Sequence, residues 1–259
     1  MAIAIIGGMV QQGLQASQID VVEPFDASRE RLQTDLGVTT HAQAGAFLGE
    51  AGTVIWAVKP QIFHQVTENV RGYTGGALHI SVAAGIRSDS IAGWLGNERV
   101  VRTMPNTPAL IGKGITALFA RPAVSPEDRE QAERIMGSTG AYLWLQSEPH
   151  LDAVTALSGS GPAYMFYFME AMTRTGVELG LDPAQAHQLA VATFIGAGEL
   201  ARASEDPPEI LRQRVTSKGG TTYAAITSMD ESGVKDLFAK AMHAAHRRAQ
   251  EMGDEFGKA

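Results

Sequence analysis

The sequence has no cysteine among its 259 residues. This absence excludes disulfides, thiolate catalysis and metals held by sulfur. Long apolar runs are lacking too, and the apolar opening of the chain is short and has no basic flank, which argues against a membrane span and a signal peptide. We therefore expect a soluble, cytoplasmic protein with no membrane partner.

An excess of basic charge is also absent. The chain has 21 Lys and Arg against 28 Asp and Glu, a formal net charge of -7. This balance argues against nucleic acid or an anionic membrane as a partner, so any anion site has to be local. With 44% hydrophobic and 19% charged residues, the composition is that of a globular protein. The length suits two domains of ordinary size.

Short apolar runs alternate with amphipathic stretches in the first half of the chain. The runs are rich in β-branched residues and mostly apolar on both faces, a pattern typical of buried parallel strands. Repeated strand–helix units predict an α/β fold with a doubly wound Rossmann sheet over residues 1–150. The predicted strands are 2–6, 19–22, 53–58, 78–82 and 100–104, with 116–119 and 142–145 nearer the sheet edge, and the predicted helices are 27–36, 62–70, 88–95 and 130–136.

From residue 151 to residue 259 the pattern is helical only, which predicts an all-α C-terminal domain. The segment Tyr164–Met169 is apolar on every side of a helix, so it has to be covered all round. We infer that it lies at a subunit interface; the alternative is the central helix of a monomeric bundle. The predicted helices are 161–179, 183–203, 207–215, 221–229 and 233–252.

The first predicted strand runs into Gly7 and Gly8, where a dinucleotide-binding fold places its phosphate loop. These glycines are candidate cofactor-binding residues, although the full G-x-G-x-x-G fingerprint is absent. The stretch Gly7–Gln18 barely supplies the roughly a dozen residues that a crossover between parallel strands needs. We therefore expect residues to be missing from a loop after Gly8.

Small or rigid residues follow three successive predicted strands. Ligands of such sheets bind beyond the carboxyl ends of the strands, and these ends leave room for flat rings. Glu23 would favour NAD by accepting from a ribose hydroxyl, whereas Ser28 and Arg29 would receive the 2′-phosphate of NADP, and the pattern leaves this choice open. The candidate cofactor-binding residues are Ala57, Val58, Lys59, Pro60, Ala83, Ala84, Gly85 and Asn106.

Hydroxyls, one cation and two glycines gather in Val215–Thr222, directly before a predicted helix. Adjacent glycines let backbone N–H groups converge on one point, and the helix adds its positive N-terminal end. The stretch is suited to hold a small anion; the alternative is an ordinary helix start after a Gly-Gly turn. The histidines form no cluster with metal-ligand spacing, so no metal site is predicted.

Four motifs occur in a fixed order and together extend over nearly the whole chain: Ala57–Pro60, Val101–Pro108, Leu157–Tyr164 and Val215–Thr222. They resemble the pyrroline-5-carboxylate reductase family. The resemblance implies NAD(P)H-dependent reduction of 1-pyrroline-5-carboxylate to L-proline, the last step of proline biosynthesis, with NADPH as the usual cofactor and NADH as the alternative. It also implies a Rossmann domain, a helical dimerisation domain, homodimers that often assemble into decamers, and about ten residues absent after Gly8, where the family continues its glycine-rich loop.

The resemblance implies that the stretch Val215–Thr222 is the substrate site. Ser217, Gly219, Gly220 and Thr221 would hold the substrate carboxylate, and Thr222 would hydrogen-bond the imine nitrogen as the catalytic residue. Glu205 matches an acidic position of the family and is a further candidate for substrate binding. Two alternatives stay open: another two-domain NAD(P)-dependent imine or hydroxy-acid reductase, and a non-catalytic nucleotide-binding protein.

Overall fold

The computed structural model of the chain describes residues 1–257, and the chain separates into two compact units. The first unit holds residues 1–160 together with the end of the chain from residue 245, and the second unit holds residues 161–244. The chain therefore enters the helical unit after Ser160 rather than at residue 151, and its last helix ends in the first unit.

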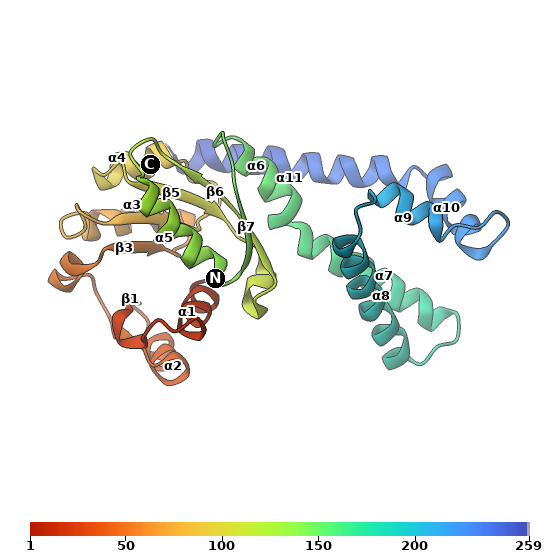
Figure 1. Cartoon of the computed structure of the whole chain (residues 1–259), viewed down its shortest axis with the longest axis horizontal. Helices are drawn as coiled ribbons and strands as arrows, with labels where there is room; N and C mark the ends of the chain where they lie inside the picture. Colours follow the sequence, from red (N-terminus) through yellow and green to blue (C-terminus); the bar gives the residue numbers. More distant parts are fainter. Residues whose placement is uncertain (258–259) are drawn as a thin grey trace. The chain divides into compact units, whose positions relative to one another are not determined.

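A five-stranded sheet lies at the centre of the first unit (Figure 1). Its strand order is β3-β4-β5-β6-β7, and all neighbouring pairs are parallel except β5 and β6, which are antiparallel. This sheet confirms the predicted α/β class. The strands are β3 (Thr53–Trp56), β4 (Leu78–Ser81), β5 (Val100–Met104), β6 (Gly114–Ala120) and β7 (Gly140–Trp144).

Helices pack on this sheet through apolar stripes that match its apolar faces. Phe63 of α3 (Pro60–Val70) and Ile91 of α4 (Ser88–Leu95) are fully buried in one cluster with Trp56 of β3. The remaining helical elements of the unit are α2 (Asp26–Leu36), α5 (Pro126–Gly137), α6 (His150–Val154), a π-helical turn at Thr155–Gly159, and 3-10 turns at Ala16–Gln18, Ala46–Glu50 and Thr107–Ile111.

The start of α5 shows why local sequence patterns predicted several helix ends correctly. The Ser125 hydroxyl accepts the Asp128 N–H, and the Asp128 carboxylate accepts the Ser125 N–H, both at 3.1 Å. This capping box satisfies two backbone donors that the helix itself leaves unpaired. Because the pattern is local, it can be recognised without knowledge of the tertiary structure.

Residues Ala2–Gln11 form helix α1, so the predicted first strand at residues 2–6 is wrong. A short apolar run does not distinguish a strand from a buried stretch of helix, and tertiary packing decides between them. Here the neighbouring residues Ile5 and Ile6 are both buried, and they pack in two different core clusters.

Gly7 and Gly8 lie inside α1 and not in a loop. The helix runs on unbroken through both glycines, so the expected break in the chain after Gly8 is also wrong. A Cβ atom on Gly8 would collide with the carbonyl oxygen of Ser138, at the end of α5. Glycine at this position therefore serves the close packing of α1 against α5.

A separate two-stranded parallel sheet accompanies the large one. Its strands are β1 (Asp20–Val22) and β2 (Thr39–His41), which α2 connects. Strand β1 was predicted from its apolar residues. Strand β2, with the sequence Thr-Thr-His, has too few apolar residues to be recognised as a strand. Val21 packs in a small cluster with Ile6 of α1 and Leu32 of α2.

The second unit is helical throughout, which confirms the predicted all-α region. Asp182 accepts the Ala184 N–H at 2.9 Å and so caps the longest helix that lies wholly in this unit. Among residues 1–257, no helix is both long and apolar enough to cross a membrane. The helices are α7 (Gly161–Glu178), α8 (Pro183–Ala203), α9 (Pro208–Arg214), α10 (Thr221–Glu231) and α11 (Val234–Phe256), the last of which continues into the first unit.

His79 lies in β4, an inner strand of the large sheet, with none of its surface exposed. The indole N–H of Trp56 donates to Nδ1 at 3.0 Å, and Nε2 lies 3.3 Å from the carbonyl oxygen of Thr74. One ring nitrogen thus accepts and the other donates, as the neutral ring does. Burial lowers the pKa of His79 from 6.5 to about 4.

We expect His79 to make the protein less stable as the pH falls from 6.5 towards 4, because the unfolded chain binds a proton that the folded chain does not. The free energy of unfolding should drop by about 1.5 kcal/mol between pH 6.5 and about 5. Urea denaturation at several pH values measures this slope. His79→Asn should lose most of it and the exposed His243→Asn should retain it; an unchanged slope in His79→Asn would contradict the account.

Candidate active site

The stretch Val215–Thr222 contains a tight turn between α9 and α10. The Ser217 carbonyl oxygen accepts the Gly220 N–H at 3.0 Å, and Gly219 has a φ of +78°. A positive φ at the third residue of a four-residue turn is typical of a type II turn and favours glycine there. The hydroxyl of Thr216 donates to the Arg212 carbonyl at 2.6 Å and fixes the end of α9. The stretch is therefore a defined turn.

This turn leaves hydrogen-bond donors available at the start of α10. Gly220 is the N-cap residue, and no side chain in the described part of the chain caps this helix. The first N–H groups of a helix have no partner within it, and they lie at its positive end. Ser217 and Thr221 are exposed, and Thr222 is half-buried. Backbone N–H groups and hydroxyls are thus close together in sequence at the N-terminus of α10, a position that stabilises an anion.

Two charged residues were singled out near this turn, Lys218 within it and Glu205 in the loop between α8 and α9. Both are exposed. The loop that carries Glu205 is held by its neighbour Asp206, which forms an ion pair with Arg214 at 2.5 Å. Sequence reasoning missed this pair because no motif links the two positions. The substrate-binding role of Glu205 stays a prediction.

The candidate cofactor residues lie at the ends of parallel strands in the first unit. Residues 57–60 follow β3 and lead into α3, and residues 83–85 follow β4. Because β3, β4 and β5 are parallel, their carboxyl ends lie along one edge of the sheet. The structure therefore brings these residues to the same edge as Asn106, which follows β5.

Asn106 is buried, and its side-chain amide makes two hydrogen bonds within the protein. Its Nδ2 donates to the Ser158 carbonyl at 3.2 Å, and its Oδ1 accepts the Ile115 N–H at 3.0 Å. These bonds hold the Leu157–Tyr164 motif and the start of β6 against the end of β5. Within the protein the side chain therefore positions neighbouring segments, while its predicted contact with the cofactor stays a prediction.

The two halves of a dinucleotide fit this sheet edge differently. The small residues Ala57, Ala83 and Ala84 offer backbone and little bulk, which suits the flat nicotinamide ring. The phosphates find no comparable place at Gly7 and Gly8, because backbone N–H groups inside a helix are already bonded to its carbonyls. Within residues 1–257, no strand leads into α1. Phosphate binding by these two glycines stays a prediction, but the turn on which the prediction was based is replaced by a helix.

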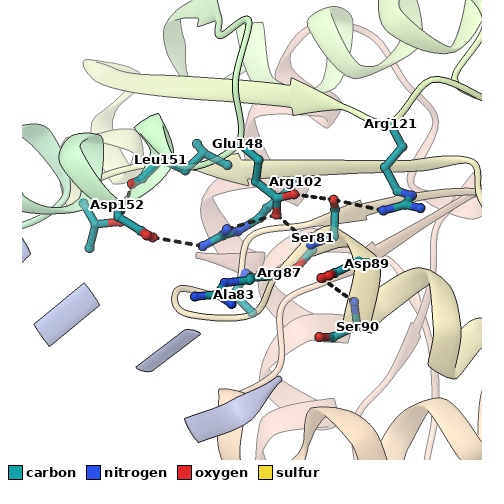
Figure 2. Close-up of polar contacts among 12 residues, drawn as sticks. Ser81, Ala83, Arg87, Asp89, Ser90, Arg102, Arg121, Glu148, Leu151 and Asp152 are labelled. Atoms are coloured by element: carbon teal, nitrogen blue, oxygen red, sulfur yellow. Dashed lines mark hydrogen bonds and ion pairs between the residues drawn. The ribbon is translucent and has the colours of Figure 1, made fainter. Parts of the chain in front are cut away.

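A buried ionic network joins β5 to α6 and to the segment before it (Figure 2). Only 4% of the Arg102 side chain is exposed; it lies 3.1 Å from the Glu148 carboxylate and 3.7 Å from that of Asp152. Glu148 also accepts the backbone N–H and the hydroxyl of Ser88, each at 2.6 Å. Arg102 was recognised only as part of a motif, because Glu148 lies 46 residues away in sequence.

Two family models match the chain. One, described as pyrroline-5-carboxylate reductase dimerisation, covers residues 148–252, and the other, described as NADP oxidoreductase coenzyme F420-dependent, covers residues 1–85. The chain is also 40% identical to a pyrroline-5-carboxylate reductase of Pseudomonas aeruginosa over 260 residues, which is 100% of this chain and 95% of the relative. The chain belongs to the pyrroline-5-carboxylate reductase family.

Solved structures agree with this membership. The chain matches a pyrroline-5-carboxylate reductase from Coxiella burnetii with a TM-score of 0.89 at 36% identity, covering 97% of this chain and 94% of that one. It matches the Plasmodium falciparum pyrroline carboxylate reductase, whose structure has NADP bound, with a TM-score of 0.87 at 26% identity, covering 96% and 93%. NADP thus occurs both in the description of the family model that matches residues 1–85 and in the solved Plasmodium falciparum structure.

The match to the dimerisation model indicates a homo-oligomer. Helix α7 shows the corresponding surface, because Phe166 is 59% and Tyr167 is 70% exposed in the single chain. Large exposed aromatic side chains that lie together mark interaction surfaces. Their position within Tyr164–Met169 agrees with the interface inferred from the sequence.

Loss of the buried cation should destabilise the first unit. We expect Arg102→Met to lower the free energy of unfolding by about 3 kcal/mol, because Glu148 and Asp152 would lose their partner in a poorly solvated place. Urea denaturation measures the loss, and Arg102→Met with Glu148→Gln should recover part of it. The exposed Arg202–Glu199 pair provides the control: Arg202→Met should cost under about 0.5 kcal/mol. Equal losses for the two arginines would refute this role of Arg102.

Proposed function

We propose that the chain reduces 1-pyrroline-5-carboxylate to L-proline, with NADPH as the usual reductant and NADH as the alternative. The observation that carries the proposal is the match to reductases of this name over the full chain. The donor-rich turn at the start of α10 supports it, because the substrate has a carboxylate and the turn suits an anion.

The substrate carboxylate is assigned to the turn before α10. The Gly220 N–H is already bonded to the Ser217 carbonyl. The N–H groups on either side of it, of Gly219 and of the first residues of α10, and the hydroxyls of Ser217 and Thr221 would donate to the two carboxylate oxygens, and the helix N-terminus adds a favourable potential. These N–H and hydroxyl donors can bind the carboxylate without a buried cation, since charge-assisted hydrogen bonds to a carboxylate are strong. Binding at this end of the substrate fixes the position of the ring.

Thr222 is assigned to the imine nitrogen. When bound, the nicotinamide supplies a hydride to the imine carbon; the π electrons of the C=N bond pass to the nitrogen, which retains the proton of the iminium form. Because the nitrogen is readily protonated near neutral pH, no strong acid is needed from the protein. Thr222 would orient the nitrogen or relay a proton, and alignment contributes most of the remaining catalysis.

The remaining assignments concern the cofactor and the assembly. The cofactor ring is assigned to residues 57–60 and 83–85 and to the backbone near Asn106. Decamers built from dimers and a cytoplasmic location are the finer proposals for the assembled protein. Light scattering of the purified protein distinguishes a dimer from a decamer.

The proposed reaction predicts loss of NADPH absorbance on addition of pyrroline-5-carboxylate, with L-proline formed in equal amount. Assays with NADH and NADPH side by side identify the preferred reductant. Oxidation of NADPH with 2-keto acids, and none with pyrroline-5-carboxylate, would instead identify a hydroxy-acid dehydrogenase. Binding of NADPH without turnover of either substrate would identify a non-catalytic protein.

Removal of the Thr222 hydroxyl should slow turnover more than it weakens cofactor binding. We expect Thr222→Ala to lower kcat by about 10- to 100-fold, because one oriented hydrogen bond to the reacting nitrogen is lost, while the Kd for NADPH stays unchanged. Thr222→Ser should retain most of the activity, and Thr227→Ala, in the same helix, is the control. Unchanged turnover in Thr222→Ala would remove Thr222 from the mechanism.

The turn itself can be tested through Gly219. An alanine at a φ of +78° is strained, so Gly219→Ala should distort the carboxylate site. We expect KM for the substrate to rise about tenfold, with a smaller change in kcat, because ground-state binding of the carboxylate is lost. Gly233→Ala is the control, since Gly233 also has a positive φ but lies after α10. A similar rise of KM in both variants would argue against the assignment.

A further inference from the structure

The loop between β4 and α4, residues 82–87, contains the stretch to which the cofactor ring is assigned. This stretch is Ala83, Ala84 and Gly85, and Gly85 has a φ of +74°, which favours glycine. Methyl groups and a bare backbone offer no polar side chain that could hold the stretch in place. Its position therefore depends on contacts that other segments make with the loop and with the start of α4.

Glu148 caps the helix that follows this loop. The N-cap residue of α4, Arg87, makes no capping bond with its side chain. Instead the Glu148 carboxylate, 60 residues further along the chain, accepts both the N–H and the hydroxyl of Ser88, the first residue of α4, each at 2.6 Å. A carboxylate at the positive end of a helix makes strong, charge-assisted hydrogen bonds. Because Ser88 is buried, water competes little for these bonds.

The same carboxylate is bonded to β5. The Arg102 guanidinium donates to Glu148 at 3.1 Å, and both side chains are largely shielded from water (Figure 2). Strand β5 is paired on both sides, with β4 and with β6, so its side chains have a fixed origin. Glu148 therefore ties the start of α4, and with it the end of the loop, to the centre of the sheet.

The last turns of α11 make a second set of contacts with this loop. A Cβ atom on Gly85 would lie 2.7 Å from the Cβ of Met252, so the helix packs directly on the loop backbone. Arg87 also forms an ion pair with Asp254 at 2.6 Å, but both side chains are exposed, and exposed ion pairs contribute little. The buried bonds of Glu148 are thus the stronger polar anchor of the loop.

We propose that Glu148 is a positioning residue for hydride transfer: through Ser88 and the start of α4 it holds the backbone of Ala83–Gly85 at the place assigned to the nicotinamide ring. This role rests on the proposed function, which assigns the ring to that stretch. Hydride transfer needs the two reacting carbons close together and aligned, and a misplacement of about 1 Å can slow a reaction about 100-fold. Glu148 acts here without contact of its own with the cofactor or the substrate.

The test compares the binding of NADPH with that of 2′,5′-ADP, which has the phosphorylated adenosine half of the cofactor and no nicotinamide. A glutamine at position 148 keeps one acceptor oxygen, so Glu148→Gln loses one bond to Ser88 and the charge beside Arg102. We expect the Kd for NADPH to rise about tenfold and that for 2′,5′-ADP to stay within about twofold, because only the nicotinamide half lies at the loop. With pyrroline-5-carboxylate, kcat should fall about 10- to 100-fold. Calorimetry and the NADPH oxidation assay measure these constants.

Two further variants separate positioning from stability. Ser88→Ala removes only the hydroxyl, with its bond to Glu148 and a long contact of 3.5 Å with Arg121, so it should produce the same changes at a smaller size. It also decides the matter if Glu148→Gln does not fold. Asp152→Asn is the matched control, because within residues 1–257 the only ion pair of Asp152 is with Arg102 of the same network. Its ratio of the two Kd values and its kcat should equal those of the wild type.

An equal rise of both Kd values in Glu148→Gln would show a structural role alone and overturn the proposal. Wild-type constants in both Glu148→Gln and Ser88→Ala would overturn it too. Failure of the proposed function is seen in the wild type instead, as binding of NADPH without oxidation on addition of pyrroline-5-carboxylate; the ratio of the two Kd values then still decides whether Glu148 positions the loop. A wild-type protein that binds no NADPH would overturn both.

Discussion

The backbone pairing of β4 with β5 is the constraint on which the rest of the first unit depends. These strands are buried on both faces, so their hydrogen bonds are formed with little competition from water. They place the segments that follow β4 and β5 at a single edge of the sheet, together with the segment that follows β3. Asn106 forms a hydrogen bond with Ser158, and Arg102 forms an ion pair with Glu148. These two interactions hold the segments around Ser158 and Glu148 beside β5. The sheet edge to which the cofactor is assigned is thus a consequence of strand pairing, with two polar side chains that fix the segments beside it.

Much of this architecture could be predicted from local patterns in the sequence. The strands β3, β4 and β5 are apolar enough to stand out, and the ends of α5 and α8 carry caps that act within a few residues. The turn before α10 could be recognised for the same reason, since two glycines before a helix start are a local signal; its substrate role stays a prediction. The four motifs then gave the family, which the comparisons confirm.

The errors have a common physical origin in tertiary context. Residues 2–6 have a strand-like composition, but they are helical because Ile5 and Ile6 are buried in two separate clusters. Strand β2 is too short and polar to be seen without its pairing to β1. The partners of Arg102 lie far along the chain, so no periodicity or spacing could reveal them. Pairing and packing between distant segments decided each of these features.

The turn between Ser217 and Thr221 is proposed to hold the substrate carboxylate, and the function of the protein depends on this contact. The most direct test is an NMR titration of the isotope-labelled protein with L-proline, with pyrrolidine, which lacks the carboxylate, as the comparison. If the carboxylate binds there, L-proline should shift the amide resonances of Gly219, Gly220 and Thr221 in a saturable manner, and pyrrolidine should not. Shifts of the same size with both ligands, or shifts by L-proline confined to other parts of the chain, would contradict it.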